Sequence, residues 1–221
     1  MSNTLEIYSA KVCPFAQRTL ICAKEKQLDF KLVEIDLRNK PDWYASISPY
    51  GKVPLLNHNG QHIYESAVIN EYLDEIFPEP HLLSSDPAIK AHMRIWIAYA
   101  SSDFVPLFYQ LLRSQDKAQQ DELRNKMLKT LRFIEENLFG KWSQNAAFMF
   151  GENISLVDIA LYPFFERFVV NGHYRQTKIP NDCVQLLRWI NTMQTRTSVK
   201  ETRNEAAFYI DYYVVYADGR R

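Results

Sequence analysis

Cys13 is the residue of this chain best placed for covalent chemistry, because Pro14 follows it where the pattern changes from strand to helix. Apolar alternation predicts a strand over 5–8, and residues 18–26 have the composition of a helix. Proline suits the first helical position, so Cys13 is predicted at the N-cap. Unpaired N–H groups and the helix dipole lower the pKa of a thiol there. We therefore interpret Cys13 as a nucleophile rather than as a buried, inert cysteine.

The predicted site has one thiol rather than two. A dithiol oxidoreductase carries a second cysteine three residues after the first, and here that position is Ala16. Cys22 lies nine residues after Cys13, which at about 100° per residue places it on the opposite side of the helix, in the predicted core. The chain has three cysteines, too few and too scattered for a disulfide framework, and this favours a reducing compartment.

Composition and charge exclude several classes of partner. The chain has 221 residues, with 26 Lys plus Arg and 26 Asp plus Glu, so no strong field favours nucleic acid or an anionic membrane. No apolar run approaches bilayer length and residues 1–4 lack the features of a signal peptide, so we expect a soluble, cytoplasmic protein without a membrane segment. The five histidines show no metal-ligand spacing, so no metal is expected.

The first part of the chain alternates short strands and helices. A turn-rich stretch with Gly60 predicts a hairpin, and the helix after it stops at Pro78. The expected elements are strands over 5–8, 29–36, 53–56 and 62–64 and helices over 18–26, 41–47 and 69–77. This order predicts a small α/β sheet with helices packed on it.

The second part is almost entirely helical. Prolines between the two parts indicate a linker, and we expect domains over 1–80 and 89–221 joined by residues 81–88. A long helix over 88–112 should be kinked or interrupted at Pro106. The predicted fold class is therefore α/β plus all-α.

Further helices of the second part are predicted from apolar stripes and from a capping signal. Ser155 and Asp158 match a capping box that opens a helix. The stripes are Leu123, Met127, Leu131, Ile134 and Leu138, then Ile159, Ala160, Phe164 and Phe168, then Leu186, Leu187, Trp189, Ile190 and Met193.

Four motifs together resemble those of the cytosolic glutathione transferases, specifically their cysteine-type omega and lambda classes. They are Cys13-Pro14-Phe15-Ala16-Gln17-Arg18, Asn39-Lys40-Pro41-Asp42-Trp43, Gly51-Lys52-Val53-Pro54-Leu55 and Glu65-Ser66. In the second part only the helix order and the capping box support the resemblance. It implies a thioredoxin-like domain followed by a helical domain, glutathione as co-substrate bound mainly by the first, and a homodimer.

The resemblance also implies which residues bind glutathione. They are Phe15, Lys40, Val53, Pro54, Glu65 and Ser66. Pro54 is cis in the family and aims the Val53 backbone at the cysteinyl unit of the peptide, which pairs with it as an added strand. Glu65 attracts the ammonium group of glutathione, and Ser66 with the N–H groups of the following helix binds the adjacent carboxylate.

Two lysines and the C-terminal aromatic stretch have open roles. Lys40 either lies near the glycine end of glutathione or is a solvated surface charge, and Lys52 either assists the anionic ligand or points to solvent. The stretch over 206–216 either covers a cleft between the domains, as in the resembled classes, or belongs to the core. Phe15, Phe208 and Tyr212 are the predicted contacts of an electrophilic substrate.

The predicted function is a glutathione-dependent thiol transferase or reductase in which Cys13 forms a mixed disulfide with glutathione. Dehydroascorbate, protein mixed disulfides and glutathionyl adducts all suit it. One alternative is conjugation of glutathione to electrophiles with the Tyr8 hydroxyl as donor. Another is a non-catalytic binding or regulatory protein of the same architecture, such as stress regulators that bind RNA polymerase, because a fold alone does not secure an activity. The chloride channel proteins share the Cys-Pro-Phe opening, but the chain lacks a membrane segment.

Overall fold

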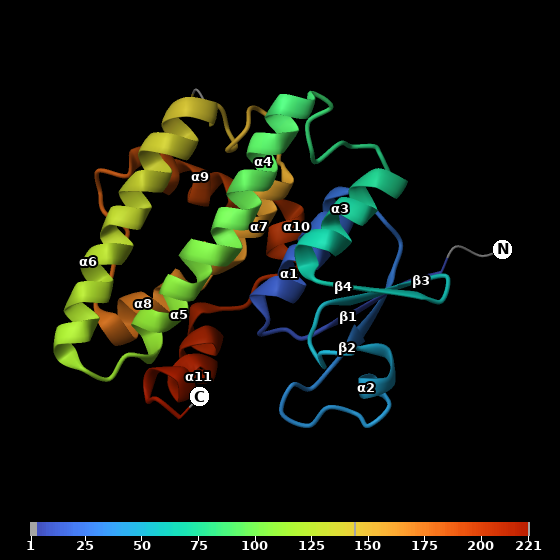
Figure 1. The fold of residues 1–221 in the computed structure, drawn as a ribbon, viewed down its shortest axis with the longest axis horizontal. Coiled ribbons are helices and arrows are strands. Elements are labelled where there is room, and N and C mark those ends of the chain that lie inside the picture. The colour runs from blue at the N-terminus through green and yellow to red at the C-terminus, as the bar shows by residue number, and fades with distance from the viewer. Residues whose placement is uncertain (1–3, 144, 221) are drawn as a thin grey trace.

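A four-stranded sheet and a group of helices lie side by side in the computed structural model, which describes residues 4–143 and 145–220 (Figure 1). The strands are β1 (Leu5–Ser9), β2 (Lys31–Glu34), β3 (Leu55–His58) and β4 (Gln61–Tyr64). Their order is β2-β1-β3-β4, with β1 parallel to β2 and antiparallel to β3, which pairs antiparallel with β4. This confirms the predicted α/β part.

Three helices belong to the sheet part: α1 (Pro14–Glu25), α2 (Tyr44–Ile47) and α3 (Ser66–Ile76). Buried Ile7 and Leu56 pack in one core with Ile21 of α1 and Ile69 of α3. On the other face of β1, Tyr8 packs with residues that include Tyr44 of α2. The alternation along β1 therefore separates two cores, as expected for a strand covered on both faces.

The hairpin turn is shorter than predicted. β3 and β4 are joined by Asn59 and Gly60 alone, with φ of 52° and 86°. Two consecutive left-handed residues form the tight hairpin turn whose twist matches that of the strands, and Asn-Gly is the sequence that favours it. The hairpin predicted from the stretch that contains Gly60 is therefore present.

The second part is helical, as predicted. Its segments are α4 (Pro87–Tyr99), η1 (Ala100–Phe104), α5 (Val105–Arg113), α6 (Lys117–Ile134), η2 (Glu135–Ser143), α7 (Leu156–Glu166), α8 (Phe168–Arg175), α9 (Val184–Thr195), α10 (Thr197–Lys200) and α11 (Ala206–Ala217). The two η segments are π-helical. η1 lies just before Pro106, so the predicted interruption of the long helix is confirmed.

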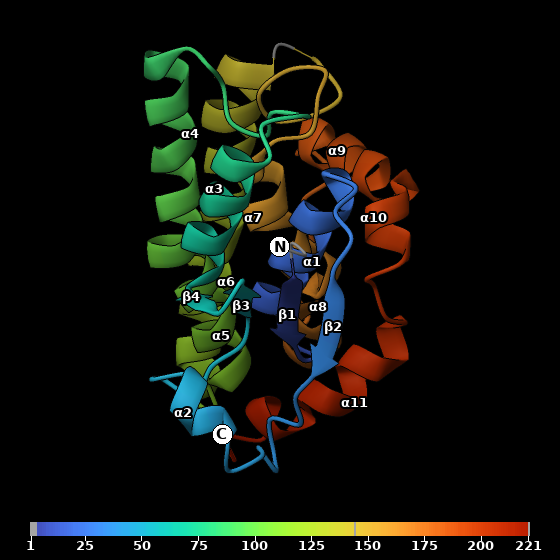
Figure 2. The same cartoon turned by 90° about the vertical axis from the view of Figure 1, so that its right-hand side faces the viewer.

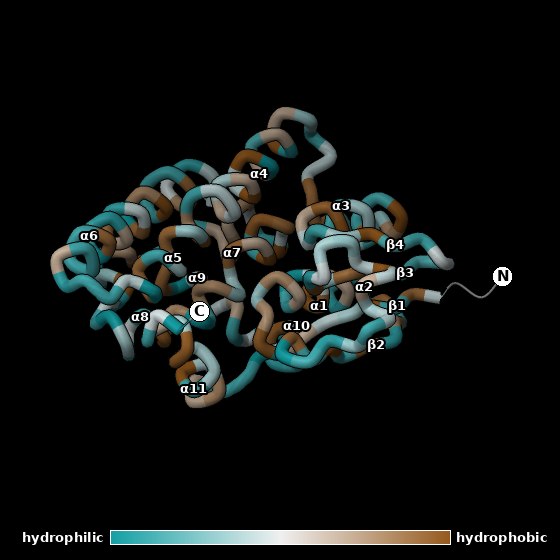
Figure 3. Tube along the Cα trace, turned by 60° about the horizontal axis from the view of Figure 1, so that its bottom comes forward, coloured by the Kyte–Doolittle hydropathy of each residue, from teal (hydrophilic) through white to brown (hydrophobic). Residues whose placement is uncertain are grey.

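The predicted capping box is present at the start of α7. Ser155 Oγ accepts a hydrogen bond from the Val157 N–H, and the Asp158 carboxylate accepts one from the Ser155 N–H at 2.8 Å. The prediction that Phe168 belongs to the same helix is wrong, because the backbone turns at Arg167 (φ −83°, ψ 0°) and α8 begins after it. In Figure 3, α6 is mostly hydrophilic and lies on the outside, whereas α7 runs through the middle and is buried over residues 156–165.

α1 joins the two parts, because it packs against α3 on one side and α7 on the other (Figure 1). At its end, the ammonium of Lys26 lies 2.7 Å from the carboxylate of Asp74 and donates to the carbonyls of Phe77 and Pro80 at 2.6 and 2.9 Å. Asp74 in turn accepts from the Leu82 N–H at 2.8 Å. A buried ion pair thus holds the segment that connects the parts. No helix within the described ranges is both long enough and apolar enough to cross a bilayer.

Candidate active site

Cys13 is the N-cap of α1, as predicted. Its backbone is extended (φ −79°, ψ 115°), Pro14 is the first helical residue, and the Gln17 N–H donates to the Cys13 carbonyl at 3.0 Å. The side chain is partly exposed, and its Sγ lies 3.6 Å from the carbonyl oxygen of Val53, to which the thiol donates. The thiol therefore sits at the start of the helix and against the segment predicted to pair with glutathione.

The predicted lowering of the Cys13 pKa is wrong for the free protein. Burial raises the pKa of the thiol, because a thiolate loses more from desolvation than a neutral thiol. The N–H groups of Ala16 and Phe15 and the positive charges of Arg167 and Arg18 act in the opposite direction without compensating. The hydrogen bond to Val53 also favours the neutral form, since the thiol is its donor. The helix N-terminus alone does not decide the charge of Cys13.

A small cavity beside Cys13 gathers five of the six residues predicted to bind glutathione. Its volume is about 90 Å³. The predicted residues that line it are Phe15, Val53, Pro54, Glu65 and Ser66. Lys40 is not among the lining residues, and its ammonium lies close to Gly51 at the edge. Lys52 does line the cavity, with its Nζ 5.7 Å from the centre of the Tyr50 ring, and Ser48, Tyr50 and Tyr64 are lining residues that the sequence did not indicate.

The backbone around this cavity has the features expected of a peptide-binding site. The Val53-Pro54 peptide bond is cis, as the resemblance implied. Glu65 has φ 70° and ψ 113°, an uncommon conformation for a residue with a side chain, and is exposed just before α3. Ser66 is the first residue of α3, is buried, and accepts from Nη1 of Arg18 at 3.5 Å. The Glu65 side chain forms no capping hydrogen bond to the N–H groups at the start of α3, and this end of the helix borders the cavity through Glu65 and Ser66.

Cys13 also lines a cleft of about 280 Å³ between the sheet part and the helical part. The sheet part contributes Val12, Pro14, Phe15 and Leu37. The helical part contributes Tyr109, Arg113, Tyr212, Tyr213 and Tyr216. Figure 2 shows β2 running toward α11, and the guanidinium of Arg38, just after β2, lies 5.2 Å from the centre of the Tyr212 ring.

Two family models match the chain on either side of this cleft. Residues 12–76 match the model described as glutathione S-transferase, N-terminal domain, and residues 117–192 match the one described as glutathione S-transferase, C-terminal domain. The chain belongs to the glutathione S-transferase family. Its predicted omega-like character within that family is confirmed by its relatives.

Three relatives illustrate the similarity. Glutathione S-transferase omega-1 of Rattus norvegicus is 32% identical over 218 residues, which are 96% of this chain and 86% of the rat protein. The probable cytosolic glutathione S-transferase DHAR1 of Oryza sativa subsp. japonica is 32% identical over 193 residues, 86% of this chain and 84% of the rice protein. The crystal structure of glutathione transferase Omega 3C from Trametes versicolor superposes with a TM-score of 0.87 at 29% identity, covering 100% of this chain and 93% of that one.

In this glutathione transferase the C-terminal aromatic stretch serves both the cleft and the core. Tyr212, a predicted substrate contact, lines the Cys13 cleft, and Tyr213 and Tyr216 line it as well. Tyr209 is buried, and its hydroxyl donates to Glu166. Phe208 does not line the Cys13 cleft. It lies one turn before Tyr212 on α11 and lines, with Tyr212, a neighbouring cavity of about 510 Å³.

Two buried arginines that the sequence did not indicate lie behind Cys13. Nε and Nη2 of Arg167 donate to the Val12 carbonyl at 3.3 and 3.2 Å, and Nη1 donates to Gln17 and, at 2.9 Å, to Pro163. Arg18 donates to the Ala160 carbonyl at 2.8 Å. Arg18 ends the motif that begins at Cys13, but the sequence assigned it no role, and Arg167 belongs to no motif. Only the packing of α7 against α1 reveals what the two side chains contact.

Tyr8 is engaged away from the thiol. Its hydroxyl donates to Oε2 of Glu6 at 3.1 Å, on the same strand. Its ring packs against Trp43 and Tyr44, with ring centres 6.0 Å apart in both cases. Burial raises the pKa of Tyr8, and the bond to Glu6 adds to this effect. These contacts give Tyr8 a structural role in β1.

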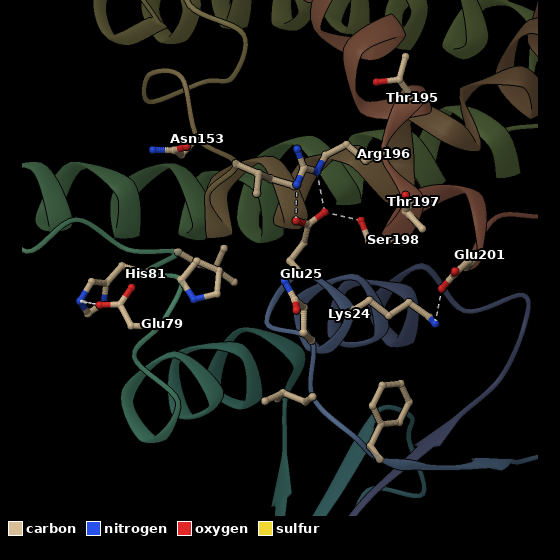
Figure 4. A pocket seen from close by; sticks show the side chains of 16 residues that line it. Lys24, Glu25, Glu79, His81, Asn153, Thr195, Arg196, Thr197, Ser198 and Glu201 are labelled. Atoms are coloured by element: carbon tan, nitrogen blue, oxygen red, sulfur yellow. Dashed lines mark hydrogen bonds and ion pairs between the residues drawn. The ribbon is translucent and has the colours of Figure 1, made fainter.

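A larger cavity than the two at Cys13 lies at the other end of α1 and does not contain Cys13 (Figure 4). Its volume is about 1050 Å³. Arg196 donates to both carboxylate oxygens of Glu25 at 2.6 and 2.5 Å, and Lys24 pairs with Glu201 at 2.6 Å. The charged groups that line this cavity therefore pair with one another. Over residues 4–143 and 145–220, no cluster of three or more His, Cys, Asp or Glu side chains has the geometry of a metal site.

Proposed function

We propose that this glutathione S-transferase is a thiol transferase and reductase of the omega type that uses Cys13 as its nucleophile. The observation that carries the proposal is the position of Cys13, which lines the cleft between the two parts and donates to the carbonyl of Val53, a residue that lines the cavity with the predicted glutathione residues. Cys22 and Cys183 are fully buried and border neither. One thiol is therefore available for exchange.

The proposed reaction is thiol–disulfide exchange at Cys13, with glutathione bound in the small cavity next to it. The Cys13 thiolate attacks the glutathionyl sulfur of a mixed disulfide, its S–S bond breaks, and the other half leaves as a thiolate that takes a proton from solvent. A second glutathione thiolate then attacks the glutathionyl sulfur bound to Cys13 and releases glutathione disulfide. The attacking glutathione is oxidised from thiol to disulfide, and the leaving half is reduced from disulfide to thiol. The glutathionyl unit of the substrate stays at the disulfide level, and Cys13 returns to the thiolate. Protein mixed disulfides, glutathionyl adducts of aromatic ketones and dehydroascorbate are the substrate classes of the proposal.

Glutathione itself supplies a reason for the thiol to ionise. In the proposed site the backbone of Val53 pairs with the cysteinyl unit of glutathione, so that a glutathione N–H donates to the Val53 carbonyl. This carbonyl is the acceptor of the Cys13 thiol in the free protein. When glutathione occupies the Val53 carbonyl, the neutral Cys13 thiol loses its hydrogen bond. The pKa of the thiol then falls, because the N–H groups at the start of α1 favour the thiolate. Glu65, Ser66 and the lysines at the edge hold the charged ends of the peptide.

The test compares three proteins in glutathione-dependent reduction of the mixed disulfide of glutathione and 2-mercaptoethanol. We expect wild type to turn over, Cys13→Ser to lose turnover, and Tyr8→Phe to keep it because the Tyr8 hydroxyl is bonded to Glu6. Turnover retained by Cys13→Ser contradicts the proposal. Conjugation that survives Cys13→Ala and fails in Tyr8→Phe supports the tyrosine mechanism instead. No activity in wild type together with no retention on immobilised glutathione supports a binding role.

We also propose a homodimer in the cytoplasm. The similarity to the rice relative described as cytosolic and the membership of the family support this. Light scattering at several protein concentrations tests the dimer, and a mass of one chain at all of them contradicts it. Fluorescence imaging of a fusion to the full chain tests the location.

A further inference from the structure

The cleft that contains Cys13 has one formally charged side chain among its described lining residues, Arg113. The other residues that line it are apolar or are tyrosines, apart from Cys13 itself, and no carboxylate is among them. The formal charge of these lining residues is therefore positive only. An uncompensated cation beside a reactive sulfur points to an anionic group on what binds there.

Arg113 is held in place by aromatic rings rather than by an acid. It is the last residue of α5, and its guanidinium lies 5.2 Å from the ring centre of Tyr109, one turn earlier on the same helix. It also lies 5.2 Å from the ring centre of Tyr216 on α11. Contacts to ring faces leave the N–H groups at the edge of the guanidinium available for hydrogen bonds. Within the described part of the chain, Arg113 forms no ion pair and is exposed.

The large cavity in Figure 4 shows the opposite arrangement. There Arg196 is bonded to Glu25 through two nitrogens, and Lys24 is bonded to Glu201. These cations already have carboxylate partners, so an anionic ligand has to displace an existing ion pair. In the Cys13 cleft an anionic ligand reaches Arg113 without displacing an ion pair. The volume of a cavity alone therefore does not identify the ligand site. The unpaired charge of Arg113 favours the smaller Cys13 cleft as the site for an anionic ligand.

We propose that Arg113 is a specificity-determining residue that binds a carboxylate or similar anionic group on the half of the mixed disulfide that leaves as a thiolate. This rests on the proposed function, in which the glutathionyl half occupies the cavity lined by Val53 and Ser66. The other half then extends from the Cys13 sulfur into the cleft, where Arg113 is the cation it meets.

The experiment uses three glutathione mixed disulfides that differ only in the end group of the leaving half. The partner thiols are 3-mercaptopropionate, 2-mercaptoethanol and cysteamine, with a carboxylate, a hydroxyl and an ammonium. Wild type should have a higher kcat/KM for the carboxylate than for the ammonium substrate. Arg113→Gln should reduce this ratio by about tenfold, and Arg113→Glu should reverse the preference.

A control variant separates the cleft from the net charge of the protein. Lys126 is exposed on α6 and does not line the cleft, and Lys126→Glu changes the net charge by as much as Arg113→Glu. It should leave the ratio of the two kcat/KM values as in wild type. An unchanged ratio in Arg113→Glu, or an equal change in Lys126→Glu, overturns the inference.

Binding of unreactive thioethers distinguishes this inference from the proposed function. S-(2-carboxyethyl)glutathione and S-(2-hydroxyethyl)glutathione have no S–S bond, so calorimetry measures their affinities without turnover. Wild type should bind the carboxylate about tenfold more tightly, and Arg113→Gln should bind both equally. Equal affinities in wild type, or no binding of either, overturn the role of Arg113 even when Cys13 is catalytic. Turnover retained by Cys13→Ser removes the proposed function and leaves the difference in affinity as the measure of Arg113.

Discussion

Arg167, in the helical part, donates two hydrogen bonds to the carbonyl oxygen of Val12, the residue immediately before Cys13, at 3.3 and 3.2 Å. The side-chain amide of Asn204 donates to the carbonyl of Lys11 at 3.0 Å. Both carbonyls that precede the reactive thiol are thus held by residues more than 150 positions away in the chain. The orientation of Cys13 depends on the helical part as well as on its own loop.

Replacing Arg167 should change both the stability of the enzyme and the ionisation of Cys13. Arg167→Met removes a buried cation whose hydrogen-bond partners then remain unsatisfied, and we expect a loss of about 3 kcal/mol in the free energy of unfolding. The pKa of Cys13 should rise further, because the charge of Arg167 lowers it in the wild type. Urea unfolding and the pH profile of Cys13 alkylation, followed by mass spectrometry, measure the two effects.

Two further variants make the Arg167 result specific. Arg167→Lys keeps the charge but not the two-pronged bond to Val12, so it should retain part of the effect on the pKa. Arg132→Met removes an exposed arginine paired with Asp182 and should change neither quantity. An alkylation profile of Arg167→Met that coincides with that of wild type shows that Arg167 is structural only.

The rate of Cys13 alkylation in the free enzyme should depend on pH as expected for a thiol whose ionised form is disfavoured. Burial raises its pKa, so alkylation by iodoacetamide at pH 7 should be slower than that of an unfolded cysteine and should still increase above about pH 8.5, the ordinary range of a thiol. The neutral thiol favours the folded state below the pKa of the unfolded chain, and this contribution is lost as the pH rises through the higher pKa of the folded state. Relative to Cys13→Ser, wild type should therefore lose stability above about pH 8.5. Rapid alkylation that is already constant at pH 7 contradicts this.

Two lysines at the end of α1, two positions apart, should differ sharply in their contribution to stability. The Lys26 side chain is 0% exposed and is bonded to Asp74, Phe77 and Pro80, so Lys26→Met should cost about 3–5 kcal/mol by leaving a buried carboxylate unpaired. Lys24 and Glu201 are 31% and 52% exposed, so Lys24→Met should cost at most about 1 kcal/mol. Urea unfolding of both variants measures the difference.

The double variant Lys26→Met with Asp74→Asn should recover part of the loss, because no unpaired charge remains at the end of α1. Equal losses of unfolding free energy in Lys26→Met and Lys24→Met show instead that packing alone holds the connecting segment.

The charge of Glu65 should matter for glutathione and not for folding. Glu65 is exposed beside the small cavity, and Glu65→Gln keeps its shape while removing the carboxylate. We expect glutathione to bind about tenfold more weakly, the value of one charge-assisted hydrogen bond. The unfolding free energy should stay within about 0.5 kcal/mol of wild type. Calorimetric titration with glutathione is the measurement, with Glu75→Gln on the exposed side of α3 as the control. The same affinity in both variants removes Glu65 from the site.

Local signals in the sequence predicted much of the fold. Pro14 and Cys13 mark the start of α1, Asn59 and Gly60 mark the hairpin turn, and the pair Ser155 and Asp158 opens α7. Each of these rests on interactions within a few residues, which a sequence displays directly.

The features that the sequence did not reveal depend on packing between distant segments. Arg167 reaches Val12 only because α7 lies against α1, and Arg113 becomes a cleft residue only because α11 brings Tyr216 beside it. The pKa of Cys13 was predicted in the wrong direction for the same reason. The helix N-terminus is a local feature, whereas the burial that outweighs it comes from both parts of the molecule.

The donors on Arg167 and Asn204 lie in the second half of the chain, and the backbone that they hold lies in the first. A chimera that joins this sheet part to a helical part without those two donors keeps the cysteine and loses the groups that orient it. We expect recombination among family members to keep Cys13 oriented only when the loop over 11–13 and both distant donors come from the same parent. The two halves are therefore not independent modules, because side chains of the second fix the backbone that carries the nucleophile of the first.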